Sequence, residues 1–181
     1  FWTPGGSTNT TLSNIGAGTY NVTVTDLNGC TATSSVTLVN PPNLSIVVSI
    51  ASSYNGQNIA CFGGNNGAAT VTVTGGTPAY AYLWNNGGTT QTISNLTAGS
   101  YSVTVTDVNG CTRNGSVTLV NPPALNLTAN VTSNYNGQQI SCSNSTNGTA
   151  SASASGGVPT YTYLWSTGAT TPNVTGLGAG T

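Results

Sequence analysis

An internal repeat of 81 residues is the feature that most constrains the fold of this chain. Residues 12–100 match residues 93–181 at 46 of the 89 aligned positions. The best preserved segment reads IGAGTYNVTVTDLNGC at residues 15–30 and LTAGSYSVTVTDVNGC at residues 96–111. Self-similarity at a fixed period of this kind indicates an array of similar structural units that stack along the chain.

Two proline pairs mark the predicted boundaries between the units. Pro41-Pro42 and Pro122-Pro123 each follow an alternating, strand-like segment, and proline ends a hydrogen-bonded ladder because it lacks an amide proton. We also expect these 181 residues to be a segment of a longer array. The predicted units are the C-terminal half of a β-sandwich repeat at 1–42, a complete repeat at 43–123 and the N-terminal part of a third repeat at 124–181.

Short alternating segments predict that each unit is a β-sandwich. In residues 101–106 (YSVTVT), apolar and hydroxyl side chains alternate, which is the period of a strand with one buried face. About seven strands in one repeat is a density typical of immunoglobulin-like domains, so we predict an all-β fold. An odd number of strands leaves the two termini at opposite poles, which predicts a rod-like array. The expected strands of the complete repeat are 44–50, 58–61, 68–74, 80–84, 90–96, 101–106 and 115–120.

Four aromatic residues are expected to be structural. Tyr101 and its counterpart Tyr20 follow a Gly-Ser or Gly-Thr pair at the start of a late strand. This position predicts a tyrosine corner, in which the hydroxyl bonds back to upstream backbone. Trp84 and its counterpart Trp165 lie on a predicted central strand, where a tryptophan packs on the core of the sandwich.

Other aromatic residues allow a binding role as well as a structural one. Tyr80 and Tyr82 share a strand face with Trp84, and this face would serve either as core or as a platform for a sugar. The recurring segment Tyr-Asn-Gly-Gln places Tyr54 and Tyr135 in predicted loops. We expect these two tyrosines to make surface contacts, with packing against a neighbouring unit as their main role.

Each repeat holds two cysteines, which in the complete repeat are Cys61 and Cys111. A disulfide between them would close a loop from residue 61 to residue 111 and stabilise the unit by about 4 kcal/mol. Such a bond would indicate an oxidising, extracellular compartment. Pairing of Cys30 with Cys61 across the proline linker is the alternative. We predict no metal site, because the sequence has no histidine and no closely spaced cysteine pair.

Charge is almost absent from the sequence, and this excludes several classes of function. Only Asp26, Asp107 and Arg113 are charged, so no basic patch is available to bind nucleic acid or an anionic membrane. No apolar run approaches the roughly 20 residues that span a bilayer. We predict neither catalysis nor a cofactor, because the chain lacks paired carboxylates, histidine and lysine. The turn Asp107–Gly110 offers one carboxylate, which favours a structural turn over a calcium site.

The segment from Cys61 to Thr112 reads CFGGNNGAATVTVTGGTPAYAYLWNNGGTTQTISNLTAGSYSVTVTDVNGCT. It resembles the SprB repeat of gliding adhesins and other large cell-surface proteins of Bacteroidota, and the resemblance extends over the whole chain as tandem copies. It implies an immunoglobulin-like or PKD-like repeat that is secreted by the type IX system and displayed on the cell surface. The expected function is the stalk or filament of an adhesin, with neighbouring copies as partners. The alternatives are a module that binds surface polysaccharide and a fibre subunit that polymerises by strand exchange.

Overall fold

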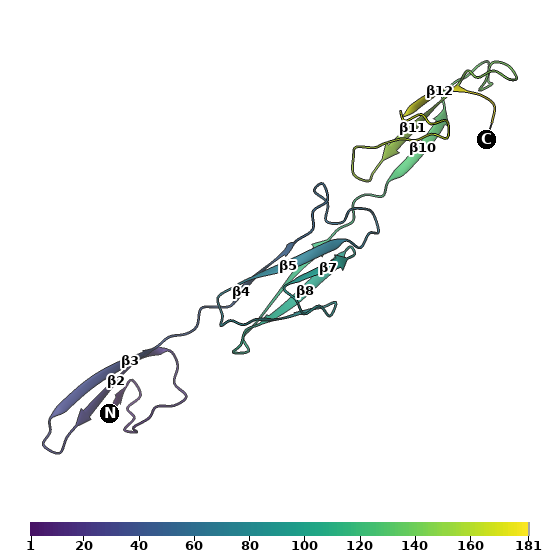
Figure 1. The fold of residues 1–181 in the computed structure, drawn as a ribbon. Helices are drawn as coiled ribbons and strands as arrows, with labels where there is room; N and C mark the ends of the chain where they lie inside the picture. The colour runs from purple at the N-terminus through teal and green to yellow at the C-terminus, as the bar shows by residue number, and fades with distance from the viewer. Residues whose placement is uncertain (181) are drawn as a thin grey trace.

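The structure is a computed structural model that describes residues 1–180, and every regular element in this range is a β-strand. These strands form four antiparallel sheets of three strands each. Figure 1 shows the sheets gathered into three successive units along an extended chain, with the N- and C-termini at opposite ends. The prediction of an all-β fold built from β-sandwich-like repeats is confirmed. Among residues 1–180 there is no helix of the length and hydropathy that crossing a membrane requires.

The middle unit contains β4 (Ser45–Ile50), β5 (Gly67–Thr74), β6 (Ala81–Trp84), β7 (Thr92–Leu96), β8 (Gly99–Thr106) and β9 (Thr112–Leu119). One sheet has the order β4-β5-β7 and the other the order β6-β8-β9. The two sheets approach closely along one side, where a Cβ added to Gly115 of β9 would lie 2.7 Å from Val48 Cγ2 of β4. The middle unit is therefore a sandwich of two small sheets that face each other.

Alternation along the strands decides which side chains form the core between these sheets. In β8, Val103 and Val105 are fully buried while the threonines between and after them lie on the outer face. Hydroxyl groups pair across the outer faces, as Thr70 Oγ1 does with Thr92 Oγ1 at 2.8 Å. The sandwich thus has an apolar interior and a hydroxyl-rich exterior. The buried core consists of Ile59, Ala69, Val71, Trp84, Ile93, Leu96, Val103, Val105 and Leu119.

The middle unit has six strands, and the seventh expected strand, at residues 58–61, does not form. Instead, Ile59 is fully buried from within a loop, and the side chain of Asn58 accepts a hydrogen bond from Val120 N at 3.0 Å. Ile59 is the one buried residue of this short segment, and it anchors the loop without providing the alternation of a strand. The prediction of a strand at 58–61 is therefore wrong.

The termini of the middle unit nevertheless lie at opposite poles, because β6 and β7 run in the same direction on different sheets. The chain changes sheets near Gly87 and Gly88, and a Cβ on Gly88 would lie 2.6 Å from Ile93 Cγ2. Together, β6 and β7 therefore carry the chain once from one pole of the sandwich to the other, which counts as one traverse. With β4, β5, β8 and β9 they give an odd number of traverses, which accounts for the extended arrangement in Figure 1.

The two outer units each contain a single sheet. The first unit has β1 (Trp2–Thr3), β2 (Gly18–Thr25) and β3 (Thr31–Leu38), and the third has β10 (Asn126–Val131), β11 (Gly148–Ser155) and β12 (Asn173–Leu177). By the sequence repeat, β2 and β3 are the counterparts of β8 and β9, while β10, β11 and β12 are the counterparts of β4, β5 and β7. The outer units are thus complementary halves of the sandwich seen in the middle.

Candidate functional site

The proline linkers are hydrogen-bonded to the unit that follows them. Pro42 O accepts a hydrogen bond from Gly76 N at 2.8 Å, and Pro123 O accepts one from Gly157 N at the same distance. Both glycines lie in the turn after the second strand of their unit, where the chain adopts a positive φ that glycine tolerates. The same contact therefore fixes each linker to the start of the next unit.

The linker between the middle and third units is also held by the unit that precedes it. Asn121 Oδ1 accepts a hydrogen bond from Gly63 N at 3.3 Å, and Pro122 is fully buried. Gly63 belongs to the loop that contains Ile59 and Phe62. A linker that is bonded on both sides restricts the bending of one unit against the next.

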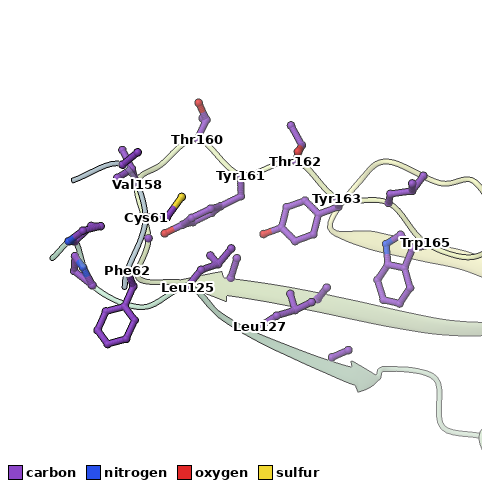
Figure 2. Close-up of a pocket in the computed structure, with 18 residues that line it drawn as sticks. Cys61, Phe62, Leu125, Leu127, Val158, Thr160, Tyr161, Thr162, Tyr163 and Trp165 are labelled. Atoms are coloured by element: carbon purple, nitrogen blue, oxygen red, sulfur yellow. The ribbon is translucent and has the colours of Figure 1, made fainter. Parts of the chain in front are cut away.

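An apolar hollow of about 500 Å³ lies beside this junction. Cys61 and Phe62 of the middle unit form one end of it, and Leu127, Tyr161 and Trp165 of the third unit form its long wall. Figure 2 shows these side chains gathered over the exposed face of the third unit's sheet. Among the residues that the structure describes, no charged side chain lines the hollow, so its lining is suited to an apolar surface and unsuited to an ion or to acid–base chemistry.

The hollow exists because the third unit contains one sheet of the sandwich. Leu125 at its edge is 64% exposed, whereas its counterpart Leu44 in the middle unit is 6% exposed. The difference arises because sheet β6-β8-β9 covers Leu44, while no counterpart of β8 and β9 lies over Leu125. The hollow is therefore the space that a second sheet fills in the middle unit.

The first unit exposes the other half of the same interface. Leu38 of β3 is 40% exposed and its counterpart Leu119 is 1% exposed, while Val24 of β2 is 63% exposed and its counterpart Val105 is 0% exposed. Their counterparts Leu119 and Val105 are part of the core of the middle unit. Within residues 1–180, the apolar faces of the two outer units are therefore not covered by a second sheet. The sequence analysis predicted half repeats there without identifying either face.

The two tryptophans predicted to be structural differ in exposure. Trp84 is buried and donates from Nε1 to Thr90 O at 2.9 Å. Trp165 makes the corresponding bond to Thr171 O, also at 2.9 Å, but it is only half-buried and lines the hollow. Trp84 is thus inaccessible to a sugar in the middle unit.

Both tyrosines predicted to form corners bond to backbone four residues upstream. Tyr101 Oη donates to Thr97 O at 3.1 Å, and Tyr20 Oη donates to Gly16 O at 2.9 Å. The bond fixes the turn that leads into β8 or β2, as a tyrosine corner does. It forms in the first unit although that unit has only one sheet, so it depends on local sequence rather than on a complete sandwich.

The two tyrosines predicted to make surface contacts lie apart from the hollow. Tyr54 Oη donates to Asn66 O at 2.9 Å, and Tyr135 Oη donates to Asn147 O at 3.1 Å. Both rings remain exposed at the surface of their loops. Their hydroxyls thus close the loop that precedes β5 or β11, and contact with another molecule remains a prediction.

The four cysteines are free and exposed, and the predicted disulfide between Cys61 and Cys111 does not form. Cys111 immediately precedes β9, whereas Cys61 belongs to the loop whose Asn58 side chain bonds Val120 just after β9. The length of β9, roughly 25 Å at 3.3 Å per residue, therefore separates the two thiols. A disulfide needs Cα atoms about 4.4–6.8 Å apart. Pairing within the unit is thus excluded by geometry.

Asp107 organises the hairpin between β8 and β9. Its Oδ2 accepts from Thr77 N at 3.0 Å, and its Oδ1 accepts from Asn109 N at 3.0 Å and from Cys111 N at 2.8 Å. The bond from Thr77 is the main cause of a pKa below the ordinary value of this carboxyl, with the two hairpin amides adding to it. Within residues 1–180, no group of three His, Cys, Asp or Glu side chains lies close enough to hold a metal. Asp107 therefore serves the turn itself.

Replacement of Asp107 by asparagine is expected to lower the melting temperature of the middle unit at neutral pH and to have little effect in acid. The folded-state pKa lies below the ordinary value of 3.8. The ionised carboxylate therefore stabilises the fold above pH 3.8, and this contribution is lost as the pH falls through the folded pKa. Thermal unfolding followed from about pH 2 to pH 7 measures the effect. Asp26→Asn is the matched control, because the side chain of Asp26 bonds only Asn28 N and Cys30 N of its own hairpin. An equal loss of melting temperature in both variants would contradict the role of the Thr77 bond.

The fold and the bonded linkers define this chain as a tandem array of β-sandwich repeats. The family model described as the SprB repeat matches residues 53–89 and residues 134–170, two segments whose starts are 81 residues apart. The resemblance stated from the sequence is thereby confirmed. The SprB repeat is a structural repeat of cell-surface proteins, which indicates an adhesin-associated, extracellular location for this chain. A search of curated proteins finds no match.

Proposed function

We propose that this chain forms part of the extracellular stalk or filament of a cell-surface adhesin and that its function is mechanical reach. The observation that carries the proposal is the pair of bonded linkers, with Pro42 O and Pro123 O each accepting a hydrogen bond from the following unit. Because each sandwich receives the chain at one pole and releases it at the other, successive units extend the molecule. The extended arrangement in Figure 1 supports this proposal.

The outer faces of the units support the same function. Hydroxyl pairs such as Thr19–Thr37 at 2.9 Å and Thr132–Thr149 at 2.7 Å cover the exposed sides of the sheets. These groups hydrate the surface without charge. With three charged side chains in the chain, electrostatic repulsion contributes little to its shape, so the rod should keep its dimensions when the salt concentration changes.

Insertion of Gly-Ser-Gly-Ser between Pro123 and Ala124 is expected to make the rod flexible. The insertion separates Pro123 O from Gly157 N, whose hydrogen bond of 2.8 Å ties the linker to the third unit, and a Gly/Ser segment behaves as a flexible coil. Small-angle X-ray scattering of the reduced, monomeric chain measures the distribution of interatomic distances. We expect a narrow, elongated distribution for the native chain and a broad one for the variant.

The matched control carries the same four residues between Asn28 and Gly29, at the exposed tip of the hairpin between β2 and β3. This tip is remote from both linkers (Figure 1). The control should therefore scatter as the native chain does. A native chain that already scatters as broadly as the Pro123 variant would overturn the proposal of a stiff stalk.

A further inference from the structure

The first and last strands of the middle unit, β4 and β9, lie side by side and run in the same direction. β4 follows the linker at Pro42, and β9 precedes the linker at Pro122. Both strands begin at the pole where the chain enters the unit (the entry pole), because Arg113 near the start of β9 donates from Nε to Leu44 O just before β4 at 3.0 Å. We propose that β4 and β9 form a mechanical clamp that keeps the unit folded under tension. The inference rests on the proposed stalk, because a stalk carries tension from one linker to the next.

Tension between the two linkers pulls these strands past each other. The linker at Pro42 draws β4 back toward the entry pole, and the linker at Pro122 draws β9 toward the opposite pole. The ladder hydrogen bonds that hold each strand lie across its axis. A pull along the axis therefore loads all of these bonds at the same time, which is a shear geometry. The unit can open only when the bonds of one strand break together.

β4 is the more weakly held of the two strands under this load. It pairs with β5 over six residue pairs, while β9 pairs with β8 over eight. The chain just after β9 is also held by the hydrogen bond from Val120 N to Asn58 Oδ1 at 3.0 Å. β4 should therefore slide first, and the contacts that block its sliding determine the force that the unit withstands.

A notch in β9 receives the side chains of β4. Arg113, Gly115 and Val117 share the inner face of β9, because alternate residues of a strand face the same side. A Cβ added to Gly115 would lie 2.7 Å from Val48 Cγ2 and 3.1 Å from Ile46 Cδ1. The two side chains of β4 thus occupy the place that a larger residue at position 115 would need for its own side chain.

Arg113 closes the notch on the side toward which β4 is pulled. It precedes Gly115 by two positions and therefore lies nearer the entry pole, where its Nε is held by Leu44 O. Val48 would have to pass this side chain if β4 slid toward the entry pole. Arg113 thus acts as a stop against which tension presses β4. Its counterpart in the first unit is Ala32, so the sequence repeat does not itself require an arginine at this position.

Pulling one protein in two directions tests the clamp in the full chain. The variant C30S/C61S/C142S loses three exposed thiols and keeps Cys111, which is exposed at the entry pole just before β9. When this variant is held by its two ends, β4 is loaded in shear. When it is held by its N-terminus and Cys111, the middle unit is loaded at two points of the same pole, so β4 is peeled from β5 one residue pair at a time. Optical tweezers measure the unfolding force in each geometry.

The unfolding force should be at least about threefold lower when the chain is held at Cys111, because peeling breaks the ladder bonds singly and shear breaks them together. Opening of the middle unit from the two ends is recognised by its length. Release of residues 43–123 lengthens the chain by about 250 Å, at roughly 3.3–3.6 Å per residue less the folded length. Equal forces in the two geometries would overturn the clamp.

Arg113→Ala tests the stop in the same variant. The side chain is exposed, so its removal should change the melting temperature little. The unfolding force from the two ends should fall by roughly a third, because the ladder of β4 remains while the stop and one hydrogen bond are lost. The unfolding force from Cys111 should change much less, because peeling lifts β4 away without pushing Val48 past position 113.

Asn114→Ala is the matched control, because Asn114 is the exposed neighbour of Arg113 on the opposite face of β9. It should leave the unfolding force unchanged in both geometries. An equal fall in force for Asn114→Ala and Arg113→Ala, or no fall for Arg113→Ala, would overturn the role of Arg113 as the stop. The stiffness of the linker is measured by scattering without applied force, so the clamp and the proposed stalk can fail separately.

Discussion

Replacement of Trp84 by alanine is expected to lower the free energy of unfolding of the middle unit by about 3–5 kcal/mol. The side chain is 1% exposed and lies in the core with Ile93 and Val103. Its removal opens a cavity between the two sheets, and Thr90 O loses the donor that now lies at 2.9 Å. Chemical denaturation followed by far-UV circular dichroism measures the loss.

Trp165→Ala is the matched control for this substitution. Trp165 donates to Thr171 O at the same distance as Trp84 does to Thr90 O, but it lines an open hollow and is only half-buried. We expect a loss of about 1–2 kcal/mol from the third unit, because less of its area is removed from water on folding. Equal losses in free energy of unfolding would show that burial of Trp84 in the sandwich core contributes no stability beyond that of the indole hydrogen bond. The comparison is made in reductant, so that the four exposed cysteines stay free.

The alternating segments allowed much of the fold to be predicted from the sequence. β5 and β8 have apolar side chains at every second position, and this pattern forms a strand wherever one face is buried. The corner bond of Tyr101 to Thr97 O depends on residues only four positions apart. Features that depend on residues close together in the sequence could therefore be predicted from the sequence alone.

The path of the chain between strands was harder to predict from the sequence. The wrong prediction of a disulfide between Cys61 and Cys111 follows from this. Counting two cysteines in each repeat does not show at which pole each one lies. Cys111 lies at the start of β9 and Cys61 lies near its end, and only the pairing of the strands shows this. The change of sheet between β6 and β7 could not be predicted for the same reason. Apolar and polar side chains alternate along a strand in the same manner whichever sheet the strand joins.

The candidate site depends on how the sandwich divides between its sheets. The sequence repeat predicted a C-terminal half at 1–42 and an N-terminal part at 124–181. It did not predict that each part would be one whole sheet with an apolar face, because β6 and β7 are neighbours in sequence but belong to different sheets. The exposure of Val24 and Leu125 became apparent only once Val105 and Leu44 could be seen covered in the middle unit.

Replacement of Gly75 by alanine is expected to destabilise the middle unit and the joint that leads into it by about 3 kcal/mol. The residue has a φ of +67°, a region that costs other residues about 1–2 kcal/mol. An added Cβ would also lie 2.0 Å from Asn43 O of the linker. The linker backbone would have to move, and the hydrogen bond from Gly76 N to Pro42 O at 2.8 Å would be strained with it. Thermal unfolding measures the loss of stability, and X-ray scattering shows the loosened joint.

Gly87→Ala separates the two causes of this loss. Gly87 has a φ of +85°, and nothing lies within 4 Å of a Cβ added there. Its replacement introduces backbone strain without a collision, so we expect a loss of about 1 kcal/mol and an unchanged scattering profile. Gly156→Ala should reproduce the effect of Gly75→Ala at the next joint, because its Cβ would lie 1.9 Å from Ala124 O. If Gly75→Ala costs no more than Gly87→Ala, the close approach of the linker does not stabilise the joint, and the rod must owe its stiffness to other contacts.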